Sequence, residues 1–196
     1  MEKNNYLDKV KYLLVTSFIP AGYKITKDVE LSTIPEATKY DALNFSLNNQ
    51  KIVYRKGKNT EDRPGAFLAI WKRPSSSIVN NKPIALESNE IDYLFVEVEE
   101  HSSIVSNEGS INDLRKGIFI FPVSILIAKG IISSEKKKGK TGFRVFPPWS
   151  EDKGVVGMKV FSQSGKKTQC WQLPYYIEIN KDGSIDSFKL DKIFNA

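Results

Sequence analysis

Apolar residues near the N-terminus recur at helical spacing and predict an amphipathic helix. The apolar face is formed by Tyr6, Leu7, Val10, Leu13 and Leu14. Lysines and Asp8 occupy the other face, and Pro20 and Gly22 end the pattern. The interruption by Asp8 and the shortness of the apolar stretch argue against a signal peptide. We therefore expect a helical segment within residues 1–35, packed on the rest of the chain.

The next apolar runs have the length of strands. Alternation predicts strands at 40–47 and 51–55, joined by a turn at Asn48 and Asn49. Three continuous apolar runs predict central strands covered on both faces, at 66–71, 91–98 and 117–121. Two further elements complete the pattern, namely a short helix at 122–129 that Gly130 ends and a strand at 143–146.

These elements predict a mixed α/β (α+β) fold, with a central mixed sheet flanked by helices. The segment 56–65 is polar and basic and is predicted to be a loop. No linker or repeat divides the sequence, so we expect one domain over residues 1–196.

Composition narrows the function classes. Twenty-nine Lys and Arg residues exceed 23 Asp and Glu residues, for a net charge of +6. Cys170 is the only cysteine and His101 the only histidine, which excludes an intramolecular disulfide and Cys-rich or multi-histidine metal centres. A lone thiol fits a reducing cytoplasm. The longest apolar run, 117–132, is interrupted and shorter than the roughly 20 residues of a membrane span, so we expect a soluble protein.

Basic residues interleave with aromatic and amide residues, a pattern that favours nucleic-acid binding. The expected phosphate contacts are Arg55, Lys58, Arg63, Lys72, Arg73, Arg144 and Lys167. The expected hydrogen-bond donors are Thr60, Thr168, Gln169 and Gln172. The expected stacking residues are Trp149 and Trp171. The alternative is that these charges form a solvated rim and that the aromatic rings belong to the core.

An ordered set of motifs resembles the MepB-like family. The matching stretches lie at 54–60, 65–73, 92–94, 119–130, 144–149 and 167–176. Two positions depart from the family pattern, because Glu61 replaces a usual proline and Val123 replaces a usual lysine. The resemblance implies a bacterial, cytoplasmic protein with a restriction-endonuclease-like core that associates with nucleic acid. We expect DNA to be the partner and no cofactor to be needed.

Nucleases of that fold hold Mg²⁺ with carboxylates on neighbouring strands, next to a lysine. Asp92 and Glu97 are the candidate acids, but the expected partner strand at 117–121 carries neither an acid nor a lysine. We therefore predict binding without catalysis, with an Mg²⁺-dependent nuclease as one alternative. A second alternative is a small-ligand or protein-binding module in a drug-resistance context. An apolar pocket lined by Trp71, Trp149 or Trp171 would favour that alternative.

Overall fold

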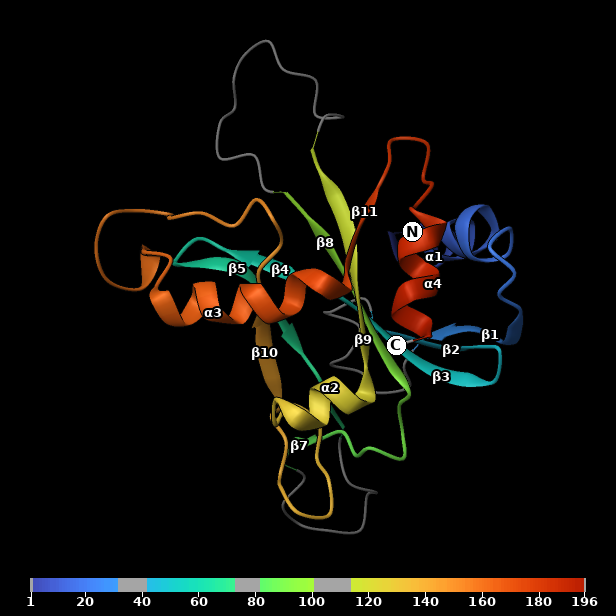
Figure 1. Cartoon of the computed structure of the whole chain (residues 1–196), viewed down its shortest axis with the longest axis horizontal. Coiled ribbons are helices and arrows are strands. Elements are labelled where there is room, and N and C mark those ends of the chain that lie inside the picture. The colour runs from blue at the N-terminus through green and yellow to red at the C-terminus, as the bar shows by residue number, and fades with distance from the viewer. Residues whose placement is uncertain (1, 32–41, 73–81, 101–113, 196) are drawn as a thin grey trace.

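A computed structural model describes residues 2–31, 42–72, 82–100 and 114–195 (Figure 1). Its largest unit is a six-stranded sheet in the order β1-β2-β3-β8-β9-β11. The strands are β1 (Ile25–Leu31), β2 (Leu43–Leu47), β3 (Gln50–Lys56), β8 (Tyr93–Glu99), β9 (Lys116–Pro122) and β11 (Tyr176–Ile179). The pair β3–β8 is parallel and the other neighbours are antiparallel, so the predicted central mixed sheet is confirmed.

A second sheet of three strands lies beside the first, in the order β10-β5-β4. It consists of β4 (Lys58–Thr60), β5 (Arg63–Ala69) and β10 (Gly142–Val145). Residues 66–69 of the apolar run at 66–71 therefore belong to the middle strand of a separate sheet instead of joining the central one. The segment predicted to be a loop folds largely as the β4–β5 hairpin, because its backbone groups pair although its side chains are polar. Two short strands, β6 (Trp71–Lys72) and β7 (Ile84–Ala85), pair with each other.

Four α-helices surround the described strands. The N-terminal helix comprises α1 (Glu2–Leu13) and a π-helical turn (Leu14–Phe18), and β1 follows it within the segment expected to be helical. The predicted short helix is α2 (Val123–Ala128). The sequence pattern missed α3 (Gln163–Gln172) and α4 (Ser187–Phe194). Their first turns are capped by Ser162 and Asp186, whose side chains accept backbone hydrogen bonds.

The central sheet is buried on both faces, which explains its continuous apolar runs. One face packs on α1, the π-helical turn and α4 through residues such as Leu14, Phe95 and Leu190. The opposite face packs on β5, β10 and α2 through residues such as Leu68 and Leu126. Figure 1 shows α1 and α4 together on the right, and the small sheet with α3 on the left. No helix in the described part of the chain is long and apolar enough to cross a bilayer.

We expect Gly117→Ala to destabilise the fold by about 1–3 kcal/mol, because overpacking forces backbone or rings to shift. A Cβ atom at Gly117 would lie 2.2 Å from the Tyr176 ring, which covers this glycine from β11. Urea unfolding measures the change. The matched control is Gly154→Ala, whose Cβ meets only the flexible Lys159 side chain and should cost under about 0.5 kcal/mol. Equal stability of the two variants would contradict this account of the sheet.

Candidate nucleic-acid interface

Most of the residues predicted to bind nucleic acid lie in one part of the molecule, which we call the hairpin–helix lobe. It comprises residues 58–69 and 142–172, that is, β4, β5, β10, the connection 146–162 and α3. Figure 1 shows these elements projecting together to the left of the central sheet. The lobe contains the cations Lys58, Arg63, Arg144, Lys153, Lys159, Lys166 and Lys167. Its acidic residues are fewer: Glu61, Asp62, Glu151 and Asp152.

Arg144 ties the three strands of the lobe together. Its Nη2 donates to Thr60 Oγ1 at 2.8 Å, and its Nη1 donates to the carbonyls of Pro64 and Gly65 at 3.3 Å each. The guanidinium also lies 5.9 Å from the centre of the Phe67 ring. Burial lowers the pKa of Arg144. Arg144 and Thr60 therefore serve first to hold the β4–β5 hairpin on β10.

Two glutamines on α3 attach the helix to the end of β10. Gln172 is fully buried; its Oε1 accepts from Phe146 N at 2.8 Å and its Nε2 donates to Arg144 O at 2.9 Å. Gln169 Nε2 donates to Pro147 O at 2.9 Å. These side chains were expected to contact nucleic acid, but they are used to satisfy backbone groups that β10 leaves unpaired at its end. Their role in the structure is to position α3.

The opposite face of α3 is exposed and basic. Gln163, Lys166, Lys167 and Cys170 follow each other at helical spacing, and all four are exposed. We call these four residues the α3 stripe. The helix contains no acidic residue, and neither lysine makes an ion pair with any residue that the structure describes. Thr168, beside the stripe, is half-buried and donates to Ser164 O. Lys167 was predicted, whereas Gln163 and Lys166 were not among the predicted contacts.

Two predicted phosphate contacts lie outside the lobe, and their environments do not suit that role. Arg55 is only 4% exposed, its Nη1 donates to Tyr54 O at 2.8 Å, and burial lowers its pKa to about 10. Lys72 lies 2.8 Å from Glu90 and 3.3 Å from Glu87. Burial lowers the pKa of Lys72, but these two carboxylates outweigh that effect and raise it. Arg73 lies outside the described residues.

The β4–β5 hairpin carries two more predicted contacts at the surface. Lys58 is exposed on β4. Arg63 opens β5, and its Nε lies 3.3 Å from the Asp62 carboxylate, with both side chains about half exposed. Such an exposed pair is weak, so Arg63 can exchange this partner for a phosphate at little cost.

The two predicted stacking residues lie apart from each other and are half-buried. Trp171, at the end of α3, packs on Phe121 at 5.6 Å between ring centres, and Lys129 Nζ lies 5.4 Å from its ring. Trp149 contacts Tyr176 edge-on, and the Arg115 guanidinium lies 5.3 Å from its ring. Core packing, which was the alternative interpretation, describes both indoles better than base stacking does.

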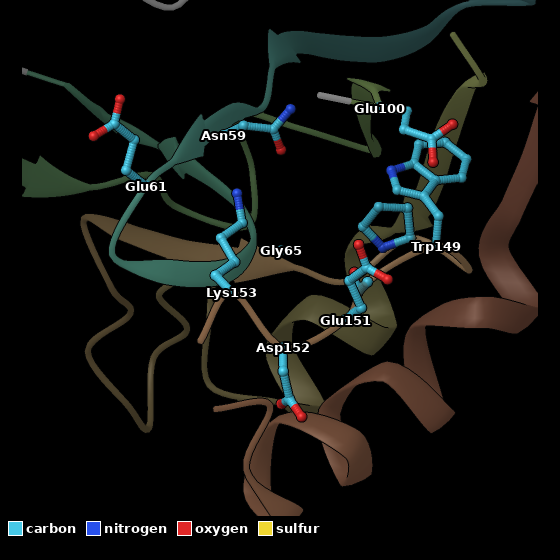
Figure 2. Close-up of a pocket in the computed structure, with 10 residues that line it drawn as sticks. Asn59, Glu61, Gly65, Glu100, Trp149, Glu151, Asp152 and Lys153 are labelled. Carbon is cyan, nitrogen blue, oxygen red and sulfur yellow. The ribbon is translucent and has the colours of Figure 1, made fainter. Parts of the chain in front are cut away.

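Trp149 also forms one wall of a pocket of about 440 Å³ between the hairpin and the connection to α3. Figure 2 shows Trp149 and Glu100 on one side of the pocket and Lys153 and Glu61 on the other. Glu151 and Asp152 also line it. Four carboxylates against one ammonium group make this pocket unfavourable for phosphate, and it is not the apolar pocket that a small-ligand module would present.

The two candidate catalytic acids do not share a site. Asp92 directly precedes β8, and its Oδ2 accepts from Lys51 N at 2.7 Å. Glu97 lies five residues further along the extended chain, about 16 Å away, and accepts from the Tyr54 hydroxyl. Two ligands of one Mg²⁺ ion each lie about 2 Å from it, a condition these carboxylates do not meet. Within the described residues, no three His, Cys, Asp or Glu side chains gather in a way that could hold a metal ion.

Comparisons with known proteins place the chain in a family. The model of the MepB-like family matches residues 35–178, more than half of the chain. The crystal structure of MepB is similar to this structure with a TM-score of 0.59 and 27% identity, over 79% of this chain and 87% of that chain. A bacterial homing endonuclease matches with a TM-score of 0.37 and 15% identity, over 71% of this chain and 84% of that chain, too weak a likeness to support an argument. The restriction-endonuclease-like core therefore stays a prediction. The search of curated proteins gave no match.

Replacing Gln172 with leucine should destabilise the protein by about 2–4 kcal/mol, because it leaves Phe146 N–H and Arg144 C=O buried without partners. Urea unfolding measures the loss. Gln163→Leu, the same substitution on the exposed side of α3, is the control and should cost under about 0.5 kcal/mol. A small effect of Gln172→Leu would show that α3 is held by other contacts.

Two glutamates of β8 should respond to pH with opposite signs. Burial raises the pKa of Glu97 above 4.5, so the unfolded chain loses this proton first and stability falls as pH rises from 4 towards 7. Glu97→Gln removes that fall and should gain stability relative to the natural chain between pH 4 and pH 7. Burial also raises the pKa of Glu99, but Lys56 and Lys116 outweigh it and lower the pKa overall.

Glu99→Gln is therefore the control, and it should lose stability relative to the natural chain over the same interval. Urea unfolding at pH 4 and pH 7 gives both differences. The same sign for both variants would contradict the environments described for these two carboxyl groups.

Proposed function

We propose that this chain, which belongs to the MepB-like family, is a nucleic-acid-binding protein that uses the hairpin–helix lobe. The resemblance to that family is what implied an association with nucleic acid. DNA is the expected partner, and no catalytic step is assigned to the protein. The α3 stripe is the centre of the interface in this proposal. Lys166 and Lys167 contact phosphates, and Gln163 donates a hydrogen bond to a phosphate or a base edge.

The observation that carries the proposal is the pairing state of the cations. Lys166 and Lys167 make no ion pair within the described part of the chain, unlike Lys72. An ammonium group that is already solvated and unpaired gives up only water and counterions when it meets a phosphate, and the release of counterions from the nucleic acid favours binding. Lys58 and Arg63 on the neighbouring hairpin extend the basic surface.

The shape of the lobe also supports a duplex as the partner. An α-helix fits the major groove of B-DNA, which is about 12 Å wide, when one long face of the helix is free. The α3 stripe provides such a face, and Gln172 and Gln169 hold the helix firmly from behind. The second alternative, a small-ligand module, is less well supported. The pocket beside Trp149 is acidic, and the basic residues of the lobe lie together on its neighbouring elements instead of being dispersed over the surface.

Duplex DNA binding by the natural chain should weaken steeply with salt, and Lys166→Ala with Lys167→Ala should flatten that dependence. Each lost phosphate contact lowers the slope of log K against log salt by about 0.9 for B-DNA. We therefore expect the double variant to lose about 1.8 from the slope. Fluorescence anisotropy with labelled duplex and single-stranded oligonucleotides, at several salt concentrations, measures it.

The matched control removes two exposed lysines of α1, in Lys9→Ala with Lys11→Ala, and should leave the slope unchanged. Absence of binding by the natural chain to both oligonucleotides would overturn the proposed function. An equal loss of slope in both double variants would mean that binding is spread over the whole surface and is not centred on α3.

A further inference from the structure

We propose that residues 152–161 form an apolar wedge that inserts between base pairs of a DNA duplex next to the α3 stripe. This inference rests on the proposed function and adds a second mode of contact to it. This loop exposes large apolar side chains that no other part of the described structure covers. Val155 is 94% exposed, Val156 76% and Met158 60%.

The base of this loop is held by hydrogen bonds and by packing of aromatic rings. Asp152 Oδ1 accepts from Phe161 N, and Lys153 N donates to Lys159 O at 2.7 Å. The Phe161 ring stacks on Phe146 with 5.1 Å between ring centres. At the tip, Gly157 adopts a φ of +66°, a conformation that suits glycine and closes the turn. A wedge with a fixed base loses little conformational entropy when it binds.

The lysines near the exposed apolar residues indicate what kind of partner this tip binds. Lys159 lies next to the apolar residues and makes no ion pair with a residue in the described ranges. Lys153, at the base of the loop, lines the acidic pocket and is not counted as a phosphate contact. The α3 stripe continues this basic surface, because Lys166 and Lys167 lie about 6–8 Å along the helix axis from Ser162. An apolar tip with unpaired lysines on its α3 side fits a partner with apolar layers beside rows of negative charge, which is the arrangement of stacked bases between phosphate backbones.

Proteins that bend DNA use the same combination. They insert apolar side chains at a base step from the minor groove and hold the backbone with cations on both sides. An anionic membrane is the other partner to which an apolar and basic tip could bind, and the continuation of the cations along α3, away from the tip, favours the duplex.

The experiment uses a duplex with 2-aminopurine at a central TA step, a base whose fluorescence rises when it is unstacked. The natural chain should raise this fluorescence on binding. The tip variant, Val155→Ser with Val156→Ser and Met158→Ser, should abolish the rise and weaken binding about tenfold, equivalent to about 1.4 kcal/mol. Its salt dependence should be unchanged because no phosphate contact is removed. Circular dichroism verifies that the variant is folded.

Phe188→Ser is the matched control, because Phe188 is an exposed apolar residue of α4 at the other side of the molecule, and it should change nothing. Salt-dependent binding without a fluorescence rise, and with an unaffected tip variant, would overturn the wedge and leave the proposed function standing. Absence of duplex binding by the natural chain would overturn both. Tip-dependent binding to vesicles of phosphatidylglycerol, with tip-independent binding to DNA, would also overturn the wedge.

Discussion

The buried amide of Gln172 determines where the basic surface of this protein lies. It satisfies an N–H group at Phe146 and a C=O group at Arg144, one on each side of the last residue of β10. Because an unsatisfied buried backbone group costs about 1–3 kcal/mol, the two bonds fix the distance and rotation of α3 relative to the small sheet. That rotation turns Lys166 and Lys167 outward. Arg144 in turn links the same strand to the β4–β5 hairpin, so one polar network connects β4, β5, β10 and α3.

The fold distinguishes two kinds of basic residue that look alike in the sequence. Two of the predicted cations, Arg55 and Lys72, are buried or held by carboxylates and contribute to the fold. Cations on α3, and Lys159 on the loop 152–161, remain at the surface. The net charge of +6 is thus a poor guide to the interface, since what matters is which lysines the fold leaves without partners.

The sequence predicted the central sheet well because its strands are covered on both faces. The runs at 91–98 and 117–121 are apolar without interruption, which identifies a buried strand independently of its neighbours. Pro122 and Gly130 likewise indicated where α2 begins and ends without reference to any distant residue. The helix α3 could not be found from apolar periodicity, because the side chain it buries most deeply is Gln172. Its one local signal is Ser162, a favourable N-cap residue.

The candidate site was predicted only in part, because the surroundings of some residues depend on others far away in the sequence. Lys72 is neutralised by Glu87 and Glu90, which are 15 and 18 positions away in the chain. Arg55 lies at the end of the predicted strand 51–55 and was expected to contact phosphate, but the fold leaves it only 4% exposed. Membership of the family supplied the expectation of a nucleic-acid partner, and the three-dimensional arrangement supplied the choice of α3 over those residues.

The position of Cys170 has a practical consequence. It is the only thiol of the chain, and it is exposed on the same face of α3 as Lys166 and Lys167. A maleimide dye or spin label therefore attaches at one defined point without any engineered cysteine. Such a label reports on whatever approaches this helix, and its own bulk would compete with a large ligand there.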